Sequence, residues 1–163
     1  MRARVLAGLV AGAAVSLLSS GALAQVPQYG PNVSNEQAHK AVVSAMAEAR
    51  KQGLPMAVAV VDNAGQLVLF ERMDNTQTGS IAVSQDKAIS AAMFRRPTKA
   101  FQDAVAGGGA GLRVLTLRGA NAVEGGVPIV IDGKIVGGLG VSSGSAEQDG
   151  SVAKAGIDGL AAK

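Results

Sequence analysis

The chain has 163 residues, enough for one domain, with 15 Lys and Arg against 12 Asp and Glu. It has no Cys and a single His, which excludes a disulfide framework and zinc sites of the usual kind. Trp is absent and there are only one Tyr and three Phe, whereas Gly occurs 22 times. The core must therefore be built from small aliphatic side chains in closely spaced layers.

The first 24 residues have the pattern of a secretory signal peptide. A basic start, Met1-Arg2-Ala3-Arg4, precedes an apolar stretch at 5–19 and the small-x-small sequence Ala22-Leu23-Ala24. The apolar stretch is shorter than the roughly 20 residues that a membrane span needs. We expect cleavage after Ala24 and a periplasmic or secreted protein, with no transmembrane segment after cleavage.

Removing this segment changes the charge of the protein. It holds two of the 15 Lys and Arg and no acid, so the formal net charge falls from +3 to +1. The sequence pI of about 9.5 is therefore no indication of nucleic-acid binding, and we expect none. Residues 25–33 contain two Pro and one Gly and are predicted to be a linker, and residues 34–163 to form a single domain.

The first predicted helix begins at a capping box, in which the Ser34 hydroxyl is the N-cap and the Gln37 amide is at N3. Apolar residues then recur at helical spacing until Gly53 ends the helix. The predicted buried face consists of Ala38, Ala41, Val42, Ala45, Met46 and Ala49.

Two antiparallel hairpins are predicted farther along the chain. Strands at 56–61 and 66–73 flank the turn 62–65, and strands at 127–131 and 134–142 flank Asp132-Gly133, a favoured two-residue turn. Between the hairpins we expect a helix at 80–94, a short helix capped by Thr98 and ending at 105, and a weak strand at 112–117. A last helix spans 146–163. The predicted class is α+β, with helices covering a mostly antiparallel sheet.

Glycines dominate the second hairpin, but they do not form a nucleotide-binding motif. The run from Gly138 to Gly144 is one residue too long for a dinucleotide fingerprint, and no Walker sequence is present. The mid-strand residues Gly137, Gly138 and Gly140 are predicted to let a helix pack directly on the strand. Gly125-Gly126 lies at a strand end, where ligands more often approach the backbone.

Three polar residues each have a functional and an ordinary interpretation. His39 could be an axial haem ligand or a general base, or simply a helix residue. Asp62 could act in catalysis or only bond its own turn. Lys87 lies among small residues, so it is either a solvated lysine or a partly buried one that needs a carboxylate partner.

The most concentrated group of candidate residues is Phe94-Arg95-Arg96-Pro97-Thr98, at a helix break. Guanidinium groups bind planar carboxylates in pairs of hydrogen bonds, and a ring or hydroxyl could meet a flat macrocycle. The alternative is an exposed basic corner with Thr98 as an ordinary N-cap. Asp149, near the start of the last helix, is predicted to interact with the helix dipole.

Three stretches together resemble one protein family. They are VAVVDNAGQLVLFERMD, DKAISAAMFRRPT and GGVPIVIDGKIVGGLGVSSGSAEQD. In this order they are similar to the GlcG/HbpS-like haem-binding proteins, also called the DUF336 family. The resemblance extends from Ser34 to the C-terminus.

The resemblance implies a profilin-like three-layer α/β/α sandwich with a five-stranded antiparallel sheet, assembled into a homo-oligomer. It implies haem as the cofactor, and some members are described as haem-degrading or redox-sensing. One branch is fused to cobalamin adenosyltransferases.

The resemblance also implies roles for particular residues. Thr98 matches a position near the haem iron, Lys87 falls in a K-A-x-x-A-A stretch, and Gly125, Gly126 and Asp149 fall in the strand-and-loop signature. Some members carry Glu-x-x-Glu for iron on the second helix. Here Ala82 and Gln85 take those positions, so a metal site is not expected there.

Three functions stay open at this point. The first is an exported haem-binding protein that holds haem, or another flat anionic molecule, near Phe94–Thr98. The second is an enzyme of unknown substrate in which Lys87 and Asp62 exchange a proton; the catalytic residues are otherwise unknown. The third is an oligomeric accessory protein without small-molecule chemistry.

Overall fold

A computed structural model of the chain describes residues 26–161, so the predicted signal peptide lies outside the described residues. The elements follow one another as α1 (Asn35–Lys51), β1 (Ala57–Asp62), β2 (Leu67–Arg72), α2 (Ser80–Phe94), α3 (Lys99–Ala106), the 3-10 helix η1 (Gly109–Thr116), β3 (Gly126–Ile131), β4 (Lys134–Ser142) and α4 (Ala146–Ala161). None of the helices in this part of the chain is long and apolar enough to cross a membrane.

The four strands form one antiparallel sheet in the order β2-β1-β4-β3. Both predicted hairpins are confirmed, and pairing of β1 with β4 joins them into the α+β fold. The weak strand predicted at 112–117 is wrong, because this segment belongs to η1 and packs on α3 instead of the sheet. The expected five-stranded sheet is therefore not confirmed, since the described residues form a sheet of four strands.

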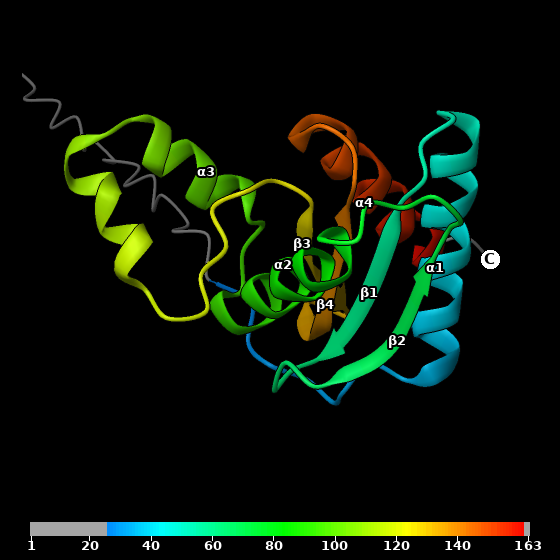
Figure 1. The fold of residues 1–163 in the computed structure, drawn as a ribbon. Coiled ribbons are helices and arrows are strands. Elements are labelled where there is room, and N and C mark those ends of the chain that lie inside the picture. Colours follow the sequence, from blue (N-terminus) through cyan, green and yellow to red (C-terminus); the bar gives the residue numbers. More distant parts are fainter. Residues whose placement is uncertain (1–25, 162–163) are drawn as a thin grey trace, which may run out of the picture.

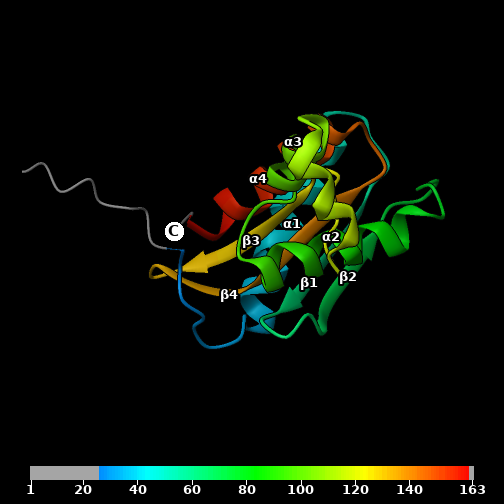
Figure 2. The same cartoon turned by 90° about the vertical axis from the view of Figure 1, so that its left-hand side faces the viewer.

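Helices cover both faces of the sheet (Figures 1 and 2). α1 and α4 pack against each other and, with the sheet, enclose the larger core, whose central residues include Met46, Ile129 and Leu139. α2 lies on the other face, over β4, β1 and β3. The predicted capping box and buried face of α1 are both confirmed. The likeness to profilin stays a prediction.

α2 approaches the sheet closely at two glycines of β4. A Cβ on Gly140 would overlap the Ser84 carbonyl oxygen and lie 2.5 Å from the Ala88 nitrogen, and one on Gly138 would lie 3.0 Å from the Ala92 nitrogen. The prediction that a helix packs on these two glycines is confirmed. It is wrong for Gly137, whose Cβ would instead meet the Val61 carbonyl of β1.

The segment predicted as a linker is attached to the domain. The Gly30 N–H donates to the Ile135 carbonyl (2.7 Å), the Ile135 N–H to the Gln28 carbonyl (2.8 Å), and the Val33 N–H to the Val136 carbonyl (2.7 Å). β1 ends at Asp62, opposite Gly137 of β4, so the start of β4 has a free edge. This segment occupies that edge, because the backbone groups there need partners.

α3 and η1 pack on each other and project from the sheet, at the left of Figure 1. We call these residues, 99–116, the lobe. Its buried side chains are Phe101 and Val114, whereas Leu112 and Leu115 are 48% and 66% exposed. The lobe thus has a very small core of its own.

Candidate functional site

Lys87 and Asp149 form an ion pair inside the protein. Lys87, on α2, is 1% exposed, and its Nζ donates to Asp149 Oδ2 (2.7 Å) and to the Val141 carbonyl (3.1 Å). Asp149 Oδ1 accepts from the Gly144 N–H (2.9 Å). Burial raises the pKa of the Asp149 carboxyl, although the Lys87 ammonium and the backbone N–H groups act to lower it. The pair joins α2, the end of β4 and the first turn of α4.

Asp62 is not the partner of Lys87, so the proposed proton-transfer pair is wrong. Asp62 Oδ1 accepts from the Ala64 N–H (2.8 Å) and the Gln66 N–H (2.9 Å), which makes it a turn residue. Of the two interpretations of Lys87, the buried lysine with a carboxylate partner is confirmed; its burial is complete and not partial, and Asp149 is the partner. Neither member of the pair lines the clefts described below.

Gly125 and Gly126 lie directly over this ion pair. Gly125 has φ +123°, and a Cβ there would lie 2.7 Å from Asp149 Cβ and 2.9 Å from Lys87 Nζ. A Cβ on Gly126 would lie 2.6 Å from Thr98 Cγ2. The chain itself fills the space that we expected a ligand to approach, so these two glycines serve close packing here.

Thr98 is fully buried and bonded to β3. Its Oγ1 accepts from the Gly126 N–H (2.9 Å), and its own N–H donates to the Gly126 carbonyl (2.9 Å). Thr98 occupies the N-cap position of α3, as predicted, but its side chain makes no cap hydrogen bond there. The hydroxyl that could face a haem iron is engaged inside the protein.

We predict that Thr98→Val lowers the free energy of unfolding by about 1–3 kcal/mol, because the buried Gly126 N–H loses its acceptor. Chemical denaturation of the purified protein measures this. Thr116→Val is the matched control, since the Thr116 hydroxyl is exposed and donates only to the Arg113 carbonyl. Equal stability of the two variants would contradict a structural role for Thr98.

The two adjacent arginines turn to different parts of the molecule. Arg95 has φ +55°, and its Cζ lies 5.4 Å from the centre of the Tyr29 ring. Arg96 Nε donates to the Phe94 carbonyl (3.2 Å), and its Cζ lies 5.6 Å from the centre of the Phe101 ring. Phe94 meets Phe101 edge to face, with ring centres 5.2 Å apart. Arg95 therefore packs on the N-terminal segment, and Arg96 packs on the lobe.

A cleft of about 260 Å³ opens beside Arg96, between α3 and η1, and we call it the lobe cleft. Its lining is mostly apolar, with an arginine at two places. The lining residues are Arg96, Ala100, Phe101, Ala104, Ala110, Gly111, Arg113, Val114 and Leu117. Sequence reasoning missed Arg113, because no local pattern shows that η1 folds back onto α3.

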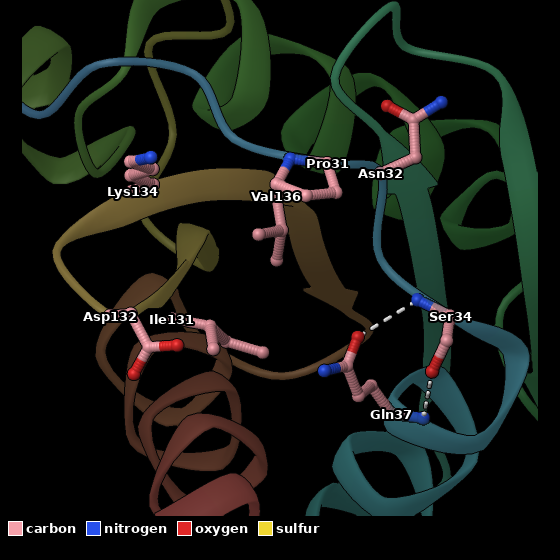
Figure 3. Close-up of a pocket in the computed structure, with 8 residues that line it drawn as sticks. All are labelled: Pro31, Asn32, Ser34, Gln37, Ile131, Asp132, Lys134 and Val136. Carbon is pink, nitrogen blue, oxygen red and sulfur yellow. Dashed lines mark hydrogen bonds between the residues drawn. The ribbon is translucent and has the colours of Figure 1, made fainter.

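A larger cleft, about 610 Å³, lies elsewhere, between the start of α1 and the turn of the second hairpin (Figure 3). We call it the hairpin groove. Its lining residues are Pro31, Asn32, Ser34, Gln37, Ile131, Asp132, Lys134 and Val136. The Ser34 N–H donates to Gln37 Oε1 (2.8 Å), so part of its polar lining already serves as the helix cap. It contains none of the predicted site residues.

His39 and the second-helix positions are separate from the lobe cleft. His39 is exposed on α1, on the sheet face opposite α2. Gln85 uses its side-chain Nε2 to donate to the Ile81 carbonyl (3.0 Å), and Ala82 has no ligand atom. Among residues 26–161, no group of three or more His, Asp or Glu side chains could hold a metal ion.

Comparison with known proteins finds relatives of this chain in one protein family. Residues 33–158 match the family described as "Haem degrading protein HbpS-like". Protein GlcG of Escherichia coli strain K12 is 36% identical over 110 residues, which cover 68% of this chain and 81% of that protein. The corrinoid adenosyltransferase PduO of Salmonella typhimurium is 31% identical over 121 residues, which cover 73% of this chain and 36% of PduO.

Solved structures agree with the sequence relatives. Klebsiella pneumoniae protein ORFY has a TM-score of 0.75 at 27% identity and covers 83% of this chain and 95% of its own. A PduOC:haem complex has a TM-score of 0.71 at 28% identity, with coverage of 78% and 94%. A double mutant of Streptomyces reticuli HbpS has a TM-score of 0.72 at 27% identity, with coverage of 95% and 97%. The order of the three motifs, the four-stranded antiparallel sheet and these relatives together show that the chain belongs to the HbpS-like family.

Proposed function

We propose that this protein is an exported haem-binding protein, and that haem or another flat anionic molecule binds at the lobe cleft beside Arg96. Membership of the HbpS-like family and the similarity to a PduOC:haem complex support a haem-related function. The observation that carries the site is the lobe cleft itself, a mostly apolar cleft with two arginines among its lining residues. Haem sensing, storage and degradation are all compatible with such a site.

The residues of the lobe cleft fit the periphery of haem. Phe101, Val114 and Leu117 offer apolar contacts to a macrocycle, and guanidinium groups suit its two carboxylates. A volume of about 260 Å³ is slightly below the usual range for small-molecule pockets, so the cleft takes one edge of the ring. Bound haem would supply the iron chemistry.

Neither candidate axial ligand, Thr98 or His39, lines the lobe cleft. The Thr98 hydroxyl is bonded to Gly126, and His39 lies on the other side of the sheet. The chain's contribution at the lobe cleft is thus to bind and orient the ring and its carboxylates.

Titration of hemin into protein that begins at Gln25 tests this function. We expect a saturable shift of the Soret band at a fixed ratio of hemin to protein. Binding should weaken as salt is raised from low to physiological ionic strength, because ion pairs at an exposed site are screened. A Soret spectrum identical to that of free hemin at every ratio would end the proposal.

We also propose that the protein works in the periplasm or outside the cell, which rests on the pattern of residues 1–24. Mass spectrometry of the protein recovered from a secreting host should give a chain that starts at Gln25. A cell-associated chain that retains Met1 would contradict export.

Self-association is part of the same proposal. Leu112 and Leu115 are exposed on a lobe with only two buried side chains, and a second copy of the chain would cover them. Light scattering should give a mass of at least twice that of the processed chain. A monomer at micromolar concentration would contradict an oligomer.

A further inference from the structure

We infer that Arg113, and not Arg95, is the second carboxylate-binding residue beside Arg96. The lobe cleft is then a two-arginine clamp for a flat, apolar molecule that carries two carboxylates. This inference rests on the proposed function and names the residues that recognise the ligand's anionic groups.

Arg96 is held in place for this role. Its Nε donates to the Phe94 carbonyl (3.2 Å), and its guanidinium lies over the Phe101 ring. The two terminal nitrogens have no partner among the interactions of the described residues. A planar group fixed in this way can donate two parallel hydrogen bonds to a carboxylate with little further loss of side-chain entropy.

Arg113 reaches the same cleft from the other helix. It lies in the last turn of η1 and lines the cleft with Arg96, although 17 positions separate the two in the sequence. Within residues 26–161, neither Arg96 nor Arg113 forms an ion pair. Two cations without an acidic partner beside apolar side chains form a site that favours an anion.

The nearby acids Asp103 and Glu124 do not neutralise the clamp, because both interact with Lys99. Lys99 Nζ lies 2.8 Å from Asp103 Oδ1 in α3 and 3.9 Å from Glu124 Oε2. Neither acid lines the lobe cleft. The positive charge of Arg96 and Arg113 is therefore available to a ligand.

Arg95 is excluded by the path of the backbone. Its left-handed conformation (φ +55°) turns the chain, and its guanidinium stacks on Tyr29. Tyr29 is itself fixed at the end of α2, because its hydroxyl donates to the Met93 carbonyl (2.9 Å). Arg95 does not line the lobe cleft.

The test compares four single variants with the wild type. Arg96→Gln and Arg113→Gln remove the two members of the clamp. Arg95→Gln is the control for the neighbouring arginine, and Arg118→Gln removes an equal charge from an exposed position just after the lobe. Dissociation constants are measured for hemin and for hemin dimethyl ester, in which both carboxylates are neutral. Circular dichroism and melting temperatures establish that each variant is folded.

We expect hemin to bind Arg96→Gln and Arg113→Gln roughly three- to tenfold more weakly than the wild type, as for loss of a partly exposed charge-assisted pair. Arg95→Gln and Arg118→Gln should keep the wild-type value within about twofold. The dimethyl ester should bind the wild type more weakly than hemin does, and the clamp variants should not weaken it further.

Two results would overturn the clamp while leaving haem binding in place. One is an Arg113→Gln variant that binds hemin as tightly as the Arg118→Gln control. The other is an equal loss for hemin and its dimethyl ester, which would mean that Arg113 acts through packing and not through a carboxylate. A wild-type protein that binds neither hemin nor metal-free protoporphyrin would overturn the clamp and the proposed function together.

Discussion

Replacing Gly140 with alanine should lower the free energy of unfolding by about 3 kcal/mol, because the new methyl group has no room between β4 and α2. It would overlap the Ser84 carbonyl oxygen and lie 2.5 Å from the Ala88 nitrogen. Both are backbone atoms of α2, so relief requires the helix to move away from the sheet. Movement of α2 would also disturb Lys87 on the same helix. Chemical denaturation measures the loss.

Gly79→Ala is the matched control for this prediction. Gly79 precedes α2 with φ −61°, an ordinary conformation for alanine, and its nearest contact would be 3.7 Å from a flexible side-chain nitrogen of Gln77. The free energy of unfolding of the Gly79→Ala variant should stay within about 0.5 kcal/mol of the wild-type value. If Gly140→Ala were as stable as this control, the close contact of α2 with β4 would be wrong.

Replacing Lys87 with methionine should cost about 3–5 kcal/mol, because it leaves the buried Asp149 carboxylate without its counter-charge. Asp149 is 3% exposed and would keep only its backbone partners, such as the Gly144 N–H. Lys154→Met is the control, since Lys154 forms an exposed ion pair with Asp158 and should change stability by less than about 1 kcal/mol. A Lys87→Met variant no less stable than Lys154→Met would contradict the buried pair.

The cost of Lys87→Met should depend on pH in a defined direction. Burial already raises the pKa of Asp149 above its ordinary value of 3.8, and loss of Lys87, which lowers it, raises it further. The variant's stability should therefore be highest below the ordinary value and fall as pH rises through the folded-state pKa, where the buried carboxyl must ionise. Denaturation of both proteins at several pH values between about 3 and 7 measures this. A deficit that grows toward acid would contradict this assignment.

The parts of the fold that local sequence patterns control were predictable. The capping box at Ser34 and Gln37 fixes the start of α1, and Asp132-Gly133 fixes the turn of the second hairpin. Each depends on residues only a few positions apart. The same holds for the buried face of α1, which follows from a period of 3.6 residues.

The errors come from contacts between distant segments. Lys87 and Asp149 are 62 positions apart, so the sequence showed that Lys87 needed an acid but not which one. Residues 112–117 looked like a strand because they are mostly apolar, yet the segment packs on α3. The hydrogen bonds of residues 28–33 to β4 could not be predicted either, because the free edge that they occupy is created by the early end of β1.

In the candidate site, residues that are neighbours in the sequence do not act together in the structure. Arg95 and Arg96 are neighbours, but the left-handed conformation at Arg95 directs them to Tyr29 and Phe101 respectively. Arg113 joins Arg96 only through the packing of η1 on α3. A pair of arginines that looked like one binding unit in the sequence is thus divided in the structure.

Hydrogen–deuterium exchange with and without hemin tests the location of the proposed site most directly. Our account predicts slower amide exchange in residues 94–117, which hold Arg96, Arg113 and the apolar lining of the lobe cleft. The hairpin groove at 31–37 and 131–136 should exchange as it does in the free protein. Protection confined to the hairpin groove, with the lobe unchanged, would contradict the account.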